Sequence, residues 1–167
     1  MGLMDGKVTL VTGSGRGIGR AVAMDLAAAG AKVVVNDFGS GLHGETTDQT
    51  PADEVVAEIK AAGGEAVANQ GSVAEAADAA RMVQDAVESF GRIDAVVNVA
   101  GILRDAYFHK MTDEEWKAVV DVHLNGTYNV SRAAMDHFRP QKLGAFVHFT
   151  STSGLVGNAG QANYAAA

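Results

Sequence analysis

A glycine-rich segment near the start of the chain has the composition of a phosphate-binding loop. Residues 12–19 read Thr-Gly-Ser-Gly-Arg-Gly-Ile-Gly and stand between an apolar run and an Ala-rich stretch with helical spacing. Glycine lets a backbone approach a pyrophosphate closely, and a helix N-terminus supplies N–H donors and positive potential. A tight loop without a ligand is the alternative interpretation. We expect nucleotide contacts from six residues, which are Gly13, Ser14, Arg16, Gly17, Ile18 and Gly19.

Asp37 is the second candidate for a nucleotide contact. It ends the second apolar run, beyond the glycine-rich segment. At this place in a dinucleotide-binding fold, a carboxylate can accept hydrogen bonds from both ribose hydroxyls of NAD and repels the 2′-phosphate of NADP. The residue therefore favours NAD. The alternative is a solvated carboxylate at the end of a strand.

Two hydroxyl-bearing residues, Ser151 and Tyr164, could act together on one carbonyl oxygen. A carbonyl that becomes an alkoxide needs a positioned donor, and hydroxyls from two segments can converge on it. Taken singly, Ser151 would be a turn hydroxyl in the Ser- and Thr-rich residues 150–154, and Tyr164 would be a half-buried core ring. Either residue alone favours these two alternatives.

These motifs together resemble those of the short-chain dehydrogenase/reductase family. Residues 12–19 follow the family's T-G-x-x-x-G-x-G pattern, residues 98–101 (Asn-Val-Ala-Gly) are similar to its N-N-A-G, and the spacing of Ser151 and Tyr164 is that of its catalytic pair. The resemblance implies an oxidoreductase that moves hydride between NAD(P) and a carbonyl or alcohol carbon. It implies that Tyr164 exchanges a proton with the substrate oxygen, which Ser151 holds.

The resemblance also implies the remaining site residues. His123 stands where most members carry an Asn that supports a water linking the catalytic Lys to solvent. A His there could hydrogen-bond to that water or be a structural histidine, and both interpretations stay open; the nearby Asn125 is out of register. Further cofactor contacts are expected from Ser72, Val73, Asn98, Ala100 and Gly101.

Two features of the resemblance bear on the cofactor and on activity. Arg16 favours NADP, because a cation within this loop often accompanies NADP in the family, so we expect NAD with NADP as the alternative. The family motif is Y-x-x-x-K, and the sequence ends at Ala167, one residue before the place of the Lys. We therefore expect this chain to be truncated and, as it stands, inactive or nearly so.

Within the family, four local phrases are most similar to the (R)-3-hydroxyacyl-CoA dehydrogenase domain of multifunctional enzyme type 2 and its bacterial relatives. They are residues 35–39, 101–105, 122–124 and 157–164. They favour a 3-hydroxyacyl thioester substrate, with a hydroxysteroid or a 3-oxoacyl carrier protein as alternatives within the same chemistry. A catalytically silent nucleotide-binding module is the alternative from another functional class.

The elements that must position these residues alternate between strand and helix. Short apolar runs predict strands at 8–11, 32–37, 65–69, 93–97 and 145–150. Helical spacing predicts helices at 17–29, 52–62, 74–90 and 113–138. This order predicts an α/β fold with a doubly wound parallel sheet, Rossmann-like and incomplete on its C-terminal side. Residues 145–149 are expected to form an exposed sheet edge, and residues 38–51 an exposed loop.

Glycines and capping residues mark the ends of these helices. Gly30, Gly63 and Gly91 follow three of them, where a left-handed C-cap favours glycine. Thr112 or Asp113 is expected to cap the fourth.

Length, composition and charge indicate the general class of protein. The chain has 167 residues, of which 47% are hydrophobic, so we expect one domain over 1–167. Its net charge of -7 without a basic run argues against a nucleic-acid partner. It has no signal-peptide pattern or membrane-length apolar stretch, so a cytoplasmic protein without a membrane partner is expected.

Cysteine and histidine usage bears on metal and redox chemistry. The chain has no Cys, and the four His other than His123, which are His43, His109, His137 and His148, share no ligand spacing with one another or with carboxylates, so no metal site is expected. The expected partner is a small-molecule substrate, and the resemblance implies a homo-oligomer, dimer or tetramer, at full length.

Overall fold

A computed structural model of the chain describes residues 2–39 and 50–167. The first half of the chain alternates strand and helix: β1 (Val8–Thr12), α1 (Gly17–Ala28), β2 (Lys32–Asn36), α2 (Pro51–Ala61), β3 (Glu65–Asn69), α3 (Ala76–Phe90) and β4 (Ala95–Asn98). The second half contains the 3-10 turn η1 (Phe108–Lys110), α4 (Asp113–Val120), the π-helical turn η2 (Asp121–Asn125), α5 (Gly126–Gln141), β5 (Ala145–His148), α6 (Thr152–Val156) and α7 (Ala162–Ala166).

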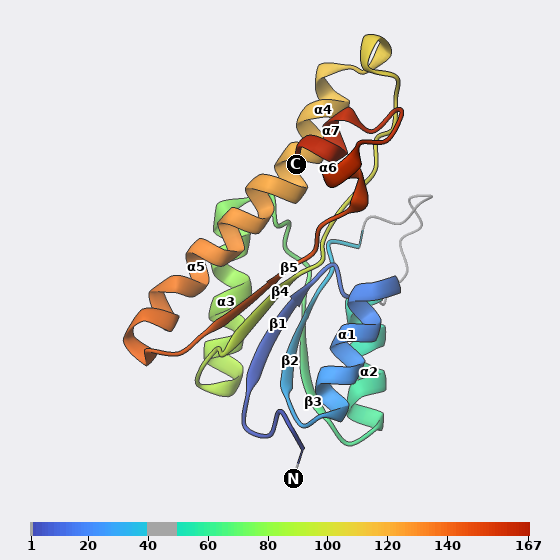
Figure 1. Cartoon of the computed structure of the whole chain (residues 1–167). Helices are drawn as coiled ribbons and strands as arrows, with labels where there is room; N and C mark the ends of the chain where they lie inside the picture. The colour runs from blue at the N-terminus through green and yellow to red at the C-terminus, as the bar shows by residue number, and fades with distance from the viewer. Residues whose placement is uncertain (1, 40–49) are drawn as a thin grey trace.

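The strands form one parallel sheet in the order β3-β2-β1-β4-β5 (Figure 1). Helices α1 and α2 cover one face, and α3 and α5 cover the other. The chain moves outward from β1 through β2 to β3 and then crosses to β4 on the other side of β1. The predicted doubly wound, Rossmann-like sheet is therefore confirmed. Its switch point lies between β1 and β4, where such sheets bind ligands.

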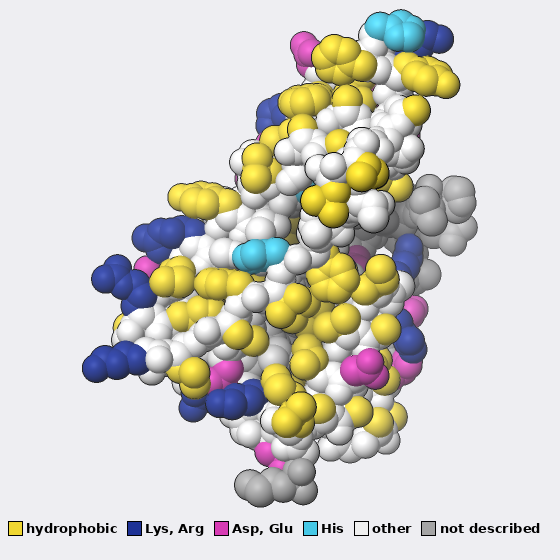
Figure 2. Space-filling model, in the orientation of Figure 1, with side chains coloured by type: hydrophobic (Ala, Val, Ile, Leu, Met, Phe, Trp, Pro, Cys, Tyr) yellow, Lys and Arg dark blue, Asp and Glu magenta, His cyan; other side chains and the backbone are white. Residues whose placement is uncertain are grey.

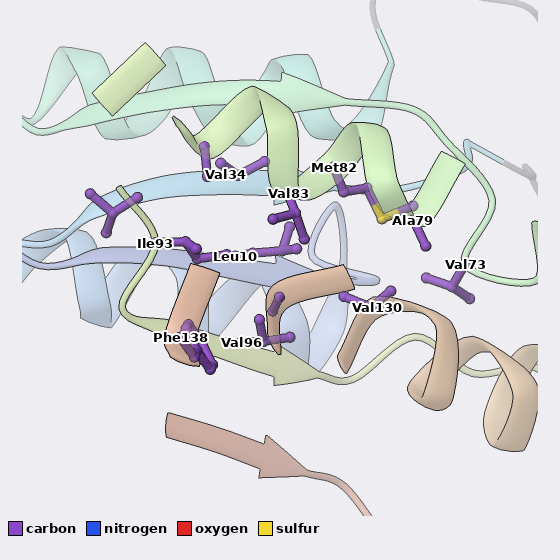
Figure 3. Packing of buried hydrophobic residues seen from close by; sticks show 13 residues of the cluster. Leu10, Val34, Val73, Ala79, Met82, Val83, Ile93, Val96, Val130 and Phe138 are labelled. Carbon is purple, nitrogen blue, oxygen red and sulfur yellow. The ribbon is translucent and has the colours of Figure 1, made fainter. Parts of the chain in front are cut away.

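The core has two parts because the sheet is covered on both faces. On the α3 and α5 side, Leu10, Val34 and Val96 pack against helix residues that include Met82 and Phe138 (Figure 3). The opposite face of the same strands is equally apolar and packs on α1 and α2. Strands buried on both faces need nearly continuous apolar runs, which is the pattern that predicted them. The carboxyl ends of the parallel strands all lie at the same end of the sheet, beneath α4, α6 and α7 (Figure 1).

The helix ends agree with the predicted caps. Gly91 has φ 81°, and Gly30 and Gly63 also have positive φ values. Thr112 is the N-cap of α4, and its side chain and that of Glu115 form a reciprocal capping box. Thr112 rather than Asp113 is therefore the cap.

The predicted helix over 113–138 differs most from the structure. A π-helical turn, Asp121–Asn125, divides it into α4 and α5. Helix α5 continues to Gln141 and includes Pro140, which lies in the last turn and so interrupts little of the helix. The π turn contains no Pro or Gly to mark it, so the apolar periodicity alone does not reveal it.

Smaller differences from the prediction concern the first residues of two elements and three short helical elements. Strand β4 begins at Ala95 rather than Ile93, because the buried Asp94 carboxylate accepts hydrogen bonds from the Val8 N–H and from Arg92. Helix α3 begins at Ala76 because residues 72–75 form a turn first. The turn η1 and helices α6 and α7 are too short for periodicity to predict. Most of the predicted loop over 38–51, residues 40–49, lies outside the described residues.

Strand β5 is the edge strand next to β4. Val147 is 49% exposed and Phe149, just beyond the strand, is 46% exposed. Hydrophobic side chains gather on the face of the molecule that carries this edge (Figure 2). The predicted exposed edge is confirmed within the described part of the chain. None of the described helices combines the length and apolarity needed to cross a bilayer.

Thr9 in the central strand provides a test of core energetics. Within the described residues, its buried Oγ1 has no hydrogen-bond partner. An unpaired buried polar group costs about 1–3 kcal/mol, so Thr9→Val, which keeps the shape of the side chain, should raise the free energy of unfolding by about 1 kcal/mol. Urea unfolding measures this difference.

Thr12 on the same strand is the matched control. Its Oγ1 accepts hydrogen bonds from the backbone N–H groups of Val99 (3.1 Å) and Ala100 (3.2 Å). Thr12→Val should lower the free energy of unfolding by about 1–3 kcal/mol, because it leaves partly buried donors unpaired. A lower urea midpoint for Thr9→Val would contradict the expectation for Thr9.

Candidate functional site

A cavity of about 450 Å³ lies at the carboxyl ends of β1 and β2. Ten of the predicted cofactor-contacting residues line it: Gly13, Arg16, Gly17, Ile18, Gly19, Asp37, Ser72, Val73, Ala100 and Gly101. The sequence-based prediction missed six further lining residues: Asn36, Phe38, Gly71, Val99, Ile102 and Val122. Most of these six residues are next to predicted residues in the sequence, so their position beside the motifs could have identified them.

At two positions of the glycine-rich loop, a side chain would collide with neighbouring backbone atoms. Gly13 has φ 62°, and a Cβ there would lie 2.6 Å from Ala100 Cα. A Cβ on Gly19 would lie 2.9 Å from Ser14 Cα and nearer still to the carbonyl of Gly13. The loop thus presents bare backbone at the start of α1, in the manner of a cradle for a pyrophosphate. The residues present therefore fit a dinucleotide.

The Asp37 carboxylate forms part of the same cavity wall. Its Oδ2 accepts a hydrogen bond from the Gly15 N–H at 3.0 Å, and its Oδ1 accepts one from the Gly39 N–H at 2.9 Å. Each carboxylate oxygen keeps a further lone pair for a ligand hydroxyl. The exposed Arg16 lines the same cavity, so a carboxylate and a cation face one ligand space.

Two predicted cofactor residues, Ser14 and Asn98, are placed differently from the other ten. The buried Ser14 hydroxyl donates to the Val11 carbonyl oxygen at 2.7 Å, so it secures the loop to β1. Asn98 donates to Ser131 Oγ at 3.3 Å, lies 3.1 Å from the His148 ring nitrogen, and lines a second cavity. In the described part of the chain, neither of these two residues therefore lines the first cavity.

The second cavity, of about 500 Å³, contains all three predicted catalytic residues. Ser151, Tyr164 and His123 line it, although they come from the N-cap of α6, from α7 and from the π turn. The two cavities share a wall that consists of Ile18, Val99, Ala100, Gly101 and Ile102. The candidate catalytic groups therefore lie beside the candidate nucleotide site.

Ser151 is the N-cap of α6. Its Oγ accepts a hydrogen bond from the Ser153 N–H at 3.2 Å. A hydroxyl also has one proton to donate, and the capping role does not use it. Ser151 can therefore donate a hydrogen bond into the second cavity while it caps the helix.

His123 packs between Tyr164 and the segment that follows β4. The rings of His123 and Tyr164 meet edge to face, with centroids 5.0 Å apart. His123 Nε2 lies 3.0 Å from the Ile102 nitrogen and 2.9 Å from the Ile102 oxygen, so it can bond to the backbone of Ile102 in either tautomer. A Cβ at Gly101 would lie 3.0 Å from the same ring nitrogen, so only glycine leaves room for the ring.

Asp121, the first residue of the π turn that carries His123, forms an ion pair with Lys117 of α4. A hydrogen bond from Lys117, followed by one from Asn125, holds the pKa of Asp121 below its ordinary value. A depressed carboxylate pKa means that this contribution to stability is present at neutral pH and disappears as the pH falls through the folded-state pKa. Asn125 is thus engaged with Asp121, on an exposed part of the turn.

Comparison with known proteins identifies the family. The model of the short chain dehydrogenase family matches residues 7–167. The chain belongs to the short-chain dehydrogenase family. Members of this family bind NAD or NADP, and the resemblance found in the sequence motifs is confirmed.

Individual short-chain dehydrogenases and related proteins agree with this assignment. A short-chain type dehydrogenase/reductase of Mycobacterium tuberculosis is 54% identical over 161 residues, which are 96% of this chain and 56% of that protein. The peroxisomal multifunctional enzyme type 2 of Mus musculus is 51% identical over 163 residues, 98% of this chain and 22% of that enzyme. The predicted similarity to multifunctional enzyme type 2 is therefore confirmed.

A solved structure shows the same fold. The crystal structure of a short chain dehydrogenase from Mycobacterium avium superimposes with a TM-score of 0.92 at 46% identity. The match covers 99% of this chain and 59% of that one. The chain thus spans little more than half the length of the mycobacterial proteins that it matches.

Proposed function

We propose that this chain forms the nucleotide-binding and proton-transfer part of an oxidoreductase, which moves hydride between NAD(P) and a secondary alcohol or carbonyl carbon. The observation that carries the proposal is the shared wall between the two cavities. It puts Ser151 and Tyr164 next to a glycine-lined cradle that fits a dinucleotide. Hydride transfer needs this adjacency, because the cofactor ring and the reacting carbon must touch.

The glycine-rich loop, Asp37 and residues 71–73 would hold the nucleotide. A bound nicotinamide supplies or accepts the hydride. In the direction of reduction, Ser151 donates a hydrogen bond to the substrate oxygen, and the Tyr164 hydroxyl transfers its proton to that oxygen as the carbon gains hydride. In the direction of oxidation, the Tyr164 phenolate receives the proton from the alcohol and becomes the neutral phenol.

The second cavity favours a substrate with an apolar chain. Leu103 and Leu124 line it, yet they are 52% and 51% exposed. An aliphatic chain would remove this apolar surface from water, which is favourable in proportion to the area covered. Together with the sequence phrases shared with the (R)-3-hydroxyacyl-CoA dehydrogenase domain, this supports a 3-hydroxyacyl thioester as the substrate.

A substrate panel tests the proposed function. The protein that carries this chain is assayed with NAD and NADP against 3-hydroxyacyl-CoA thioesters, hydroxysteroids, 3-oxoacyl carrier proteins and simple secondary alcohols. We expect the highest kcat/KM with the thioesters. Nucleotide binding without turnover of any member would instead support a silent binding module.

Asp37 is proposed to make NAD the preferred nucleotide. In Asp37→Ala the loop contacts to Gly15 and Gly39 are lost for both nucleotides, so the ratio of the two Kd values isolates the effect at the ribose. Hydrogen bonds to charged groups contribute about 1.5–3 kcal/mol, so the preference for NAD over NADP should fall about tenfold or more. Titration calorimetry measures both constants.

Arg16→Ala serves as the opposing variant, because it removes the cation that would attract a 2′-phosphate. It should weaken NADP more than NAD. An unchanged Kd ratio in Asp37→Ala would remove Asp37 from the ribose site.

A further inference from the structure

Asn163, the residue before Tyr164, is completely buried and fully hydrogen-bonded. Its Nδ2 donates to the carbonyl oxygens of Arg104 (2.9 Å) and Glu115 (3.2 Å), and its Oδ1 accepts from the Tyr164 N–H at 2.8 Å. Both amide protons and the amide oxygen are therefore used. An amide buried in this way is costly without these partners, so its place in the fold is strongly specified.

Asn163 belongs to the same helix, α7, as Tyr164. Three of its residues are alanines, which offer little side-chain surface for packing. The hydrogen bonds of Asn163 therefore contribute much of what fixes α7 against α4 and the segment after β4.

A second side chain connects the two candidate catalytic segments. Gln161 accepts a hydrogen bond from the Ser153 hydroxyl at 2.8 Å and donates one to the Asp105 carboxylate at 3.0 Å. Ser153 also donates its backbone N–H to Ser151 Oγ. The positions of Ser151 and Tyr164 are thereby linked through Gln161.

These contacts all involve one short segment, residues 102–105. Ile102 is held by His123, the Arg104 carbonyl by Asn163, and Asp105 by Gln161. The same segment begins in the wall that the two cavities share.

We infer that Asn163 is a positioning residue for Tyr164: its buried amide locks α7 to residues 104–115 and so sets where the phenol enters the second cavity. The expected effect on catalysis rests on the proposed function, whereas the positioning of Tyr164 rests on the contacts of Asn163 alone. Asn163 touches no substrate and acts only through Tyr164.

The test uses two variants and a matched control. Asn163→Leu keeps the approximate volume and removes every hydrogen bond, and Asn163→Ala also removes the bonds without the risk of a clash. Asn129→Ala is the control, because the Asn129 amide likewise donates to two backbone carbonyls, those of Val73 (3.1 Å) and Ala74 (3.2 Å), at a different place.

The readout is the magnetisation transfer between the ring protons of His123 and Tyr164, followed by NMR with labelled tyrosine. In the wild-type protein the edge-to-face contact should give clear cross-peaks. Both Asn163 variants should lose most of this intensity while core signals persist, and Asn129→Ala should retain it. Retained cross-peaks in folded Asn163 variants, or global unfolding of both, would overturn the inference.

Kinetics separate this inference from the proposed function. In the protein that carries this chain, each Asn163 variant should reduce kcat about 100-fold, the effect of a small misplacement of a reacting group, with little change in the KM for the nucleotide. Lost cross-peaks with unchanged kcat would support the positioning of Tyr164 and count against its proposed chemical role. A rise in nucleotide KM alone, with kcat unchanged and cross-peaks retained, would overturn the inference.

Discussion

Tyr164→Phe is expected to reduce kcat by about 10²–10⁴-fold in the protein that carries this chain, with little change in nucleotide affinity. The substitution removes one hydroxyl and keeps the ring that packs on His123. Proton transfer by a positioned side chain contributes about this factor, and a phenylalanine ring has no proton to transfer. Ser151 can still hold the substrate oxygen, so substrate binding should persist.

Steady-state kinetics and nucleotide titration measure the two quantities separately. Tyr128→Phe is the control, because Tyr128 is 65% exposed on α5 and lines neither cavity within the described residues. It should leave both quantities unchanged. Wild-type turnover by Tyr164→Phe would refute the proposed proton transfer.

Gly19→Ala is expected to weaken nucleotide binding about 10- to 100-fold. The added Cβ would lie 2.8 Å from the Gly13 carbonyl carbon and 2.9 Å from Ser14 Cα. These are backbone atoms of the phosphate cradle, so neither can rotate away, and the loop or the start of α1 must move. Overpacking of this kind costs about 1–3 kcal/mol, and 1.4 kcal/mol corresponds to a tenfold change in Kd.

Gly63→Ala separates this local effect from a general loss of stability. Gly63 has φ 86°, and a Cβ there would have no atom within 4 Å. Its substitution should lower the thermal midpoint because of backbone strain and leave the Kd for the nucleotide unchanged. A folded Gly19→Ala protein with wild-type affinity would show that the loop does not contact the pyrophosphate.

The parts of the site that the sequence predicts are those with a local cause. Gly13 and Gly19 are recognisable because a close approach of two backbones requires glycine at those positions, whatever surrounds them. The strands were predictable because burial on both faces leaves continuous apolar runs. Ser151 and Tyr164 were found by their spacing, and the structure brings them to one cavity.

The parts that the sequence does not predict depend on segments that meet only in the folded chain. Asn163 has a polar side chain between Ala162 and Tyr164, and its burial requires the carbonyls of Arg104 and Glu115. The partners of the Asn98 amide, Ser131 and the His148 ring, also lie far from it in the sequence. Short-range sequence patterns cannot predict these partners, because they lie far away along the chain.

The π turn between α4 and α5 lets this segment absorb a change in its length. Each residue of an α-helix advances the helix by about 100°, and a π turn holds one residue more than an α turn. Deletion of one residue from Asp121–Asn125 should therefore restore a regular helix and leave the orientation of α4 relative to α5 nearly unchanged. Deletion of one residue between Glu115 and Asp121, within regular α-helix, would instead turn Glu115 by about 100° and point its carbonyl away from Asn163. The gene should therefore tolerate a one-residue change of length in the π turn better than one in α4.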